Sequence, residues 1–158
     1  MEILEISSKF TSTIATIFAA LIAAYIANKY QKNNLDLSRE KMEKDLFTEF
    51  NKRYDELNDS LTLLSNIGST EELKATESLI ENKSMYNVLI DYFNLCAEQF
   101  YWKEKERISK EVWKSWNKGM KFYYDGYTVV RELWEEETKD EKYESYYLKQ
   151  GRDFFKEN

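Results

Sequence analysis

Histidine and proline are absent from this 158-residue sequence, glycine occurs four times and cysteine once. Without histidine there are no Ser-His or Cys-His nucleophile pairs, and the commonest general base and neutral metal ligand are missing. The scarcity of proline and glycine removes most of the turn chemistry that sheets need. We therefore expect an all-α protein that is not an enzyme and that has no catalytic residue, metal site or cofactor.

The single cysteine and the net charge bear on the cellular compartment and on the class of partner. Cys96 cannot form an internal disulfide and lies in an apolar helical pattern, which favours a buried thiol in a reducing compartment. The net charge of −6 argues against nucleic acid as a partner, because neutralising phosphates needs a basic surface. The chain is long enough for one hydrophobic core and too short for a second globular domain.

The longest apolar feature is the uncharged run from Phe10 to Asn28. At about 1.5 Å per helical residue, it is just long enough to cross a hydrocarbon layer of about 30 Å. A signal peptide would start with basic residues and end in a small-x-small cleavage site, but Glu2 and Glu5 precede the run and it contains no Ala-x-Ala. A buried core helix would be two-faced, whereas this run is apolar on all sides. The sequence therefore predicts a transmembrane helix over residues 10–28.

The charges that flank this run predict its orientation. Two acids and one lysine precede it, whereas the basic residues that follow are Lys29, Lys32, Arg39, Lys41 and Lys44. Such a basic bias is expected on the cytoplasmic side of a membrane. We therefore expect an extracytoplasmic N-terminus (1–9), the transmembrane helix (10–28), a charged juxtamembrane stalk (29–41) and a cytoplasmic helical domain (42–158).

Small residues recur every four positions within the predicted span. A spacing of four stacks side chains along one helix face, and in lipid such a smooth face lets two helices approach closely. We expect this face to mediate self-association, or packing on the helix of another membrane protein. The alternative is a plain anchor in which alanine is merely common. The predicted association face consists of Ala15, Ala19, Ala23, Ala27, Thr16, Ala20 and Ala24.

Helical patterns continue after the stalk. Apolar residues spaced by threes and fours from Met42 to Leu64 predict a long helix that Gly68 ends. Ser69 and Glu72 form a capping box for a short second helix, which we expect to extend through residues 79 and 80. A third helix, over 84–105, has apolar residues outside its main face and is predicted to be central. The aromatic tail is expected to dock on these helices or on a second copy.

The fourth predicted helix, KEVWKSWNKGMKFYY, follows Ser109 as its cap. Its apolar residues share one face, and a row of lysines occupies the other: Lys110, Lys114, Lys118 and Lys121. Residues 103–121 hold seven basic and three acidic side chains, a net of +4 in a chain of −6. Two interpretations remain open. The lysine face binds anionic lipid or another anionic ligand, or it is the solvated outside of a helical bundle.

The segment from Tyr92 to Met120 resembles an uncharacterised family of small bacterial single-span membrane proteins with a cytoplasmic helical domain. The resemblance rests on Asn94-Leu95-Cys96, on the pair Tyr101-Trp102, and on Trp113 and Trp116 before Gly119. It implies an anchor followed by a helical domain in the bacterial inner membrane. It brings no activity and no catalytic residues.

Together these patterns predict an all-α protein with one N-terminal transmembrane helix followed by a cytoplasmic bundle of four to five helices. We expect a membrane-anchored, non-enzymatic interaction protein that self-associates or binds a protein partner at the inner face of the bacterial membrane. The alternative is a membrane-acting effector or toxin of the host-defence type, whose cytoplasmic domain gates assembly of the span.

Overall fold

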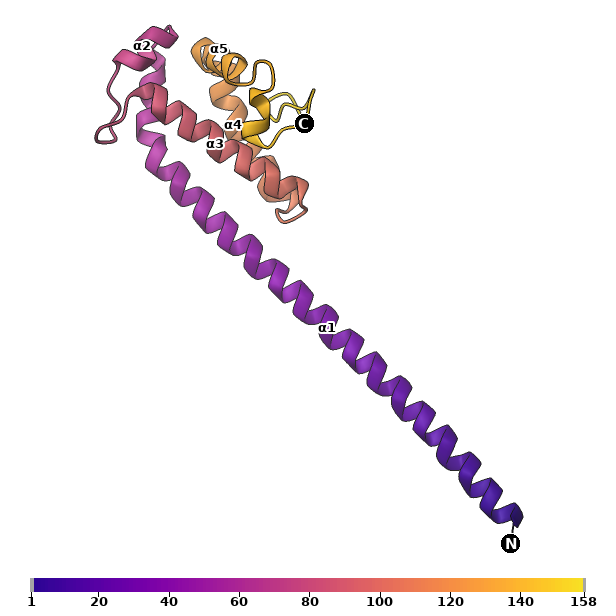
Figure 1. Ribbon diagram of the computed structural model, residues 1–158. Helices are drawn as coiled ribbons and strands as arrows, with labels where there is room; N and C mark the ends of the chain where they lie inside the picture. Colours follow the sequence, from indigo (N-terminus) through magenta and orange to yellow (C-terminus); the bar gives the residue numbers. More distant parts are fainter. Residues whose placement is uncertain (1, 158) are drawn as a thin grey trace. The chain divides into compact units, whose positions relative to one another are not determined.

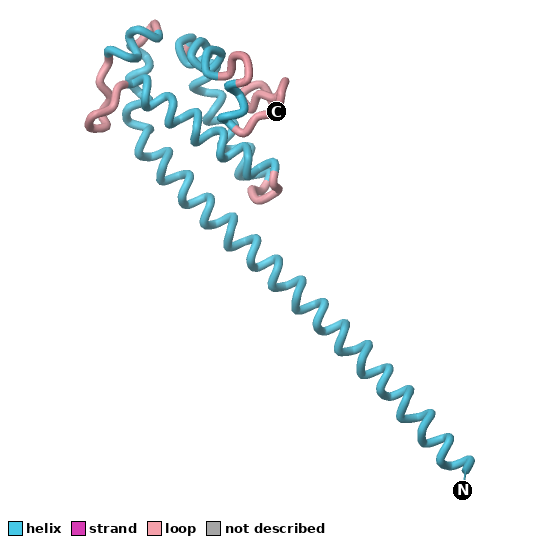
Figure 2. Tube along the Cα trace, in the orientation of Figure 1, coloured by secondary structure: helices cyan, strands magenta, loops and turns pink. Residues whose placement is uncertain are grey.

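The computed structural model describes the backbone of residues 2–157 and the side chains of residues 13–157. Met1, Asn158 and the side chains of the predicted extracytoplasmic segment 1–9 lie outside the described residues, as do those of the first three residues of the predicted span. The described chain is helical and contains no strand, which confirms the expected all-α class (Figures 1 and 2). An isolated bridge between Glu77 and Ser84 is its one sheet-like pairing.

Two compact units make up the chain, Met1–Met42 and Glu43–Asn158. The helical elements within the described residues are α1 (Glu2–Leu61), η1 (Thr62–Asn66), α2 (Thr70–Ala75), α3 (Met85–Glu104), α4 (Lys110–Gly126), α5 (Thr128–Glu137) and η2 (Lys142–Tyr146). Helix α1 contributes to both units, and the predicted stalk over residues 29–41 is part of it. It is continuous because neither proline nor glycine, the two strongest helix breakers, occurs before Gly68.

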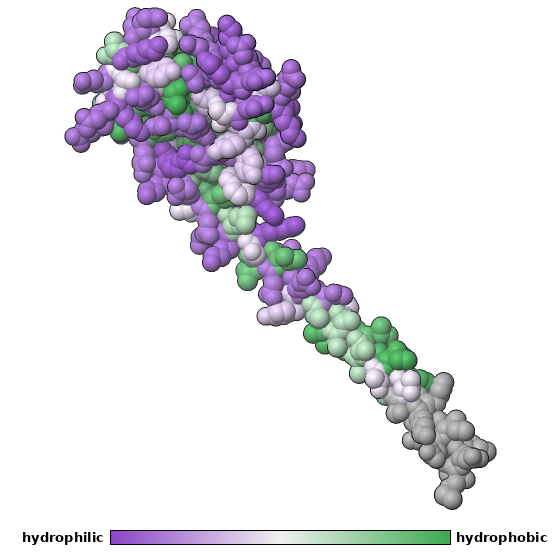
Figure 3. All heavy atoms as spheres, in the orientation of Figure 1, coloured by the Kyte–Doolittle hydropathy of each residue, from purple (hydrophilic) through white to green (hydrophobic). Residues whose placement is uncertain are grey.

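In the first unit, every described side chain from Thr13 to Met42 is exposed. These include the large apolar side chains of Ile17, Phe18 and Leu21, whose exposed fractions are 55%, 62% and 62%. Figure 3 shows a hydrophobic band on α1, followed by a mostly hydrophilic stretch. This helix is long and apolar enough to cross a membrane, by length and composition.

The core of the second unit is built around α3. Ten of its 20 residues are buried, so neighbours contact it on more than one side, as its apolar pattern predicted. Phe93 meets Trp134 of α5 with ring centroids 5.0 Å apart, and Phe100 meets Phe154 of the tail at 5.8 Å. From α1, Phe50 joins the same cluster at 2% exposure. The core therefore joins segments from both ends of the unit.

The aromatic tail docks on this core. Phe154 and Phe155 are 0% and 2% exposed, and Phe155 stacks on Tyr124 of α4 with centroids 4.6 Å apart and planes 8° from parallel. Tyr146 is also buried, whereas Tyr147 points into solvent at 59% exposure. Of the two expected docking places, the helices of the same chain and a second copy, the structure shows the first for Tyr146, Phe154 and Phe155.

The second helix is shorter than its pattern suggested. Helix α2 ends at Ala75, and Leu79, expected in its apolar face, is 65% exposed in a loop. The Ser78 hydroxyl accepts a hydrogen bond from the Ile80 amide, and the Ser60 hydroxyl accepts one from the Leu79 amide. Serine side chains that bond to nearby amides compete with helical hydrogen bonds. The prediction of a helix through residues 79 and 80 was wrong for this reason.

Serine caps begin three of the helices. The serine half of the predicted capping box at α2 is confirmed, because the Ser69 hydroxyl accepts from the Glu72 amide at 3.2 Å. The Glu72 carboxylate accepts from the amide of Gly68, the residue before the cap, at 2.7 Å. At α4, the hydroxyl of Ser109 accepts from the Val112 amide at 3.4 Å. The start of the lysine-bearing helix is thus specified locally.

We expect Ser109→Ala to lower the free energy of unfolding by about 1 kcal/mol, because the Val112 amide loses its acceptor. Ser115→Ala is the matched control, since Ser115 is exposed in the middle of α4. There alanine is the better helix former by a few tenths of a kcal/mol. Urea denaturation followed by circular dichroism would measure both. Equal midpoints for the two variants would contradict a capping role.

Candidate functional site

The predicted association face lies entirely on α1 in the first unit. Its seven residues, from Ala15 to Ala27, are described and exposed. The bulky side chains that alternate with them, such as Phe18 and Tyr25, are exposed as well, at 62% and 68%. The helix thus presents a smooth side and a bulky side, both exposed among the side chains that the structure describes.

The predicted lysine face lies on α4. Lys110, Lys114 and Lys118 are exposed, and Lys121 at the edge of the face is half-buried. The opposite side of α4 carries Trp113, Met120, Tyr123 and Tyr124, all buried in the core. Helix α4 therefore combines core packing and an exposed basic surface, as its two-faced pattern indicated.

An aromatic residue that the sequence analysis did not single out also lies on this face. Phe122 is 64% exposed. It follows Lys118 by four residues, so the two side chains stand on neighbouring turns of one surface. That spacing could have predicted the exposure of Phe122. Because Phe122 directly precedes Tyr123 and Tyr124, it was grouped with these aromatic residues. We call the exposed surface formed by Lys110, Lys114, Lys118 and Phe122 the α4 face.

A second exposed feature is centred on Tyr147. Its backbone is left-handed (φ 58°), an uncommon conformation for a residue other than glycine. Its ring lies 5.4 Å from that of Tyr101, and the Lys105 ammonium lies 5.2 Å from the Tyr101 ring centroid. Tyr147 separates two open clefts, of about 780 Å³ and about 210 Å³.

Ion pairs neutralise the larger of these clefts. The Arg53 guanidinium donates to both oxygens of Glu98, at 2.6 and 3.0 Å, and this hydrogen bonding raises the pKa of Arg53. Lys83 pairs with Asp91 at 2.5 Å. The carboxylates of Asp91 and Glu98 are thus partly exposed and ion-paired.

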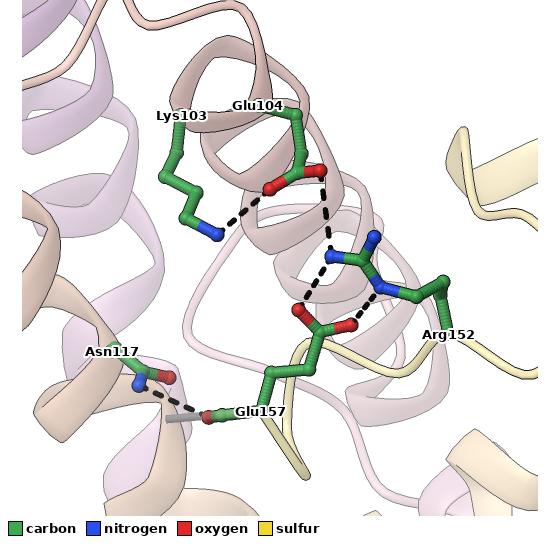
Figure 4. Close-up of polar contacts among 5 residues, drawn as sticks. All are labelled: Lys103, Glu104, Asn117, Arg152 and Glu157. Atoms are coloured by element: carbon green, nitrogen blue, oxygen red, sulfur yellow. Dashed lines mark hydrogen bonds and ion pairs between the residues drawn. The ribbon is translucent and has the colours of Figure 1, made fainter.

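The smaller cleft adjoins a cluster that holds the tail in place (Figure 4). Arg152 reaches both carboxylate oxygens of Glu157 and lies 3.4 Å from Glu104, which accepts from Lys103 at 2.7 Å. The hydrogen bond from Lys103 lowers the pKa of Glu104. On α4, Asn117 donates to the Glu157 carbonyl at 3.4 Å, while its buried Oδ1 has no partner among the described residues. The cluster joins α3, α4 and the tail.

The described residues offer little for catalysis. No group of three or more Cys, Asp or Glu residues in the described part of the chain could hold a metal ion. Cys96 is 1% exposed, and burial raises the pKa of its thiol, so the nucleophilic thiolate is disfavoured.

Comparisons of the chain with protein-family models, with curated proteins and with solved structures find no match. The function is accordingly argued from the molecule's own surfaces. Two of these stand out by chemistry: the exposed apolar stretch of α1 and the α4 face.

Proposed function

We propose that the protein is a membrane-anchored, non-enzymatic interaction protein of the bacterial inner membrane. In this proposal, α1 crosses the bilayer once through residues 10–28, and the second unit binds a protein partner or a second copy on the cytoplasmic side. The resemblance of Tyr92–Met120 to small single-span bacterial proteins agrees with this layout.

The observation that carries the proposal is the exposure of the apolar stretch on α1. Ile17, Phe18, Leu21 and Ile22 are each more than half exposed. In water, each square ångström of apolar surface costs about 25 cal/mol relative to burial, and monomeric proteins rarely leave long apolar stretches uncovered. A bilayer removes this surface from water, and a helix satisfies its own backbone hydrogen bonds there.

The flanking charges support the orientation. Positively charged residues concentrate on the cytoplasmic side of a span, and Lys29, Lys32 and Arg39 follow the apolar stretch. The second unit also contains a buried cysteine without a disulfide partner among the described residues, Cys96, which suits a reducing compartment. Both features favour a cytoplasmic location for residues 42–158.

The small-residue rows support assembly through the anchor. The predicted association face lies on the part of α1 where every described side chain, from Thr13 to Met42, is exposed. Hydrophobicity does not drive helices together in lipid. Small residues favour association there because they let the helix backbones approach closely. A second copy of α1, or the helix of another membrane protein, is the partner this face suits.

Membrane extraction and thiol labelling test the anchor and its orientation. We expect the full chain to stay in bacterial membranes after alkaline carbonate washing. In intact cells an impermeant thiol reagent should label a Ser7→Cys variant, and should label Leu79→Cys only after permeabilisation. Cys96 is buried and should stay unlabelled. Release of the chain by carbonate would end the proposal, whereas membrane depolarisation on expression would favour the effector alternative.

Cross-linking in native membranes tests the association face. Ala19→Leu with Ala23→Leu should abolish cross-linked oligomers, because the added bulk separates the helix backbones. Leu21→Phe adds bulk on the other side of the helix and is the control. An unchanged oligomer pattern in the double variant would exclude this face and leave a plain anchor.

A further inference from the structure

The lysines of the α4 face are not held in ion pairs, unlike several other cations of the second unit. Arg53, Lys83 and Arg152 each lie in an ion pair. By contrast, Lys110, Lys114 and Lys118 form no ion pair with any residue that the structure describes. Their positive charge is therefore available to an external anion.

The acidic residues of the same surface reduce this charge without cancelling it. Glu111 and Asp125 are the acids of α4, and both are exposed among the lysines. Lys121, at the edge of the face, adds a fourth lysine to the helix. Helix α4 thus carries a net positive charge in a chain whose total is −6. An anionic partner of low specificity would be attracted to this helix and repelled by much of the remaining surface.

Phe122 gives the α4 face an apolar element. Phe122 is 64% exposed one turn after Lys118, although the opposite side of α4 packs in the core. Helices that lie on bilayers combine lysines for lipid phosphates with aromatic or aliphatic side chains that enter the boundary between headgroups and acyl chains. Lysines and an exposed phenylalanine on one helix surface match that combination.

We propose that the α4 face docks on the surface of an anionic bilayer, with Lys110, Lys114 and Lys118 at lipid phosphates and Phe122 inserted at headgroup depth. This inference rests on the proposed function, in which the anchor confines the second unit near the membrane. Confinement raises the effective concentration of lipid at the face, so a modest intrinsic affinity suffices. Each lysine near an anionic surface favours docking by about fivefold.

A fluorescent reporter on the full chain tests the docking. The chain is reconstituted in vesicles of phosphatidylcholine, alone or mixed with phosphatidylglycerol, and an environment-sensitive dye is attached through Ser115→Cys. Ser115 is exposed on α4, and the buried Cys96 does not compete for the dye. We expect a blue shift and protection from an aqueous quencher in the mixed vesicles alone, reversed by high salt. A dye at Leu79→Cys, exposed in a loop, should not respond.

Variants separate the electrostatic and apolar contributions. Replacing Lys110, Lys114 and Lys118 together by glutamine should lower the docked-to-undocked ratio by about a hundredfold, at about fivefold per lysine. Phe122→Ser should reduce the blue shift while leaving salt-dependent attraction in place. Circular dichroism confirms that each variant keeps its helical content, which is expected because all four side chains are exposed.

Failure of the docking is distinguishable from failure of the anchor. If the chain resists carbonate extraction but the Ser115 reporter behaves alike in both vesicle types, the docking proposal is overturned and the anchor stands. If the chain is not integrated, it is added to preformed vesicles, where a response to phosphatidylglycerol alone would still support the α4 face. An acidic protein as the true partner would leave the reporter silent in protein-free vesicles, and this also overturns the proposal.

Discussion

Trp134→Ala is expected to lower the free energy of unfolding of the second unit by about 3–5 kcal/mol, the usual cost of truncating a buried tryptophan. The Trp134 ring is 1% exposed and lies within 5.1 Å of the ring centroids of Phe93, Phe154, Phe155 and Tyr146. Its truncation therefore removes a common neighbour of α3, η2 and the tail. Domains of this size are stable by only about 5–15 kcal/mol, so the loss is a large fraction of the total.

A hydrogen bond adds to the effect. The Trp134 indole donates to Asp153 Oδ1 at 3.3 Å, and the same oxygen accepts from the Phe155 amide. Removing the indole leaves the tail with one fewer tether as well as a cavity. Trp134→Phe also loses this hydrogen bond but leaves a smaller cavity. We therefore expect it to lower the free energy of unfolding less than Trp134→Ala does.

Urea denaturation of the full chain in detergent, followed by circular dichroism, would measure these differences. Phe122→Ala is the control, because it also truncates an aromatic residue but one that is 64% exposed. Its free energy of unfolding should stay within about 0.5 kcal/mol of that of the parent chain, as is usual for surface substitutions. If both truncations cost the same, the aromatic cluster around Trp134 would not be the centre of the core.

Ala20→Arg is expected to prevent insertion of α1. A charged residue at the centre of a span costs about 2.5–3.5 kcal/mol on the insertion scale, which corresponds to roughly a hundredfold loss in the inserted-to-free ratio. Ala20 lies near the middle of residues 10–28, too far from either end for an arginine to reach the headgroups with ease. The run is just long enough to span and is rich in alanine. Its favourable insertion free energy is therefore small and offsets little of the cost of the charge.

Carbonate extraction of membranes from expressing cells would measure this loss. The control is Asn34→Arg, which adds the same charge to α1 in the hydrophilic stretch that follows the apolar run. We expect the control to be retained as well as the parent chain, and Ala20→Arg to appear in the soluble or degraded fraction. Full retention of Ala20→Arg would contradict a membrane span through these residues.

Local sequence signals predicted much of the secondary structure. Ser69 and Ser109, the two predicted caps, each cap the helix that follows, because capping depends on a hydroxyl within three residues of the amide it accepts from. The two faces of α4 followed from its 3.6-residue periodicity. The lysines of α4 therefore lie on the side of the helix that the pattern predicted, away from the buried aromatic residues.

Features that depend on distant contacts were not predictable in the same way. The loop after Ala75 forms partly because Ser60, 19 residues before Leu79, accepts a hydrogen bond from the Leu79 amide. The clefts beside Tyr147 need α3 and the tail to meet, and no local pattern reports that meeting. Phe122 was overlooked for the opposite reason: its spacing was readable, but neighbouring buried tyrosines masked its exposure.

The position of Phe154 and Phe155 in the core has a consequence for biosynthesis. Phe155 contacts Phe93. The core around Phe93 is therefore incomplete until the last residues of the chain have been synthesised. At about 5–20 residues per second, the stretch after α5 takes on the order of one to four seconds to make. During that interval the apolar faces of α3 and α5 lack their cover, and chaperones or a second nascent chain have their opportunity to bind them.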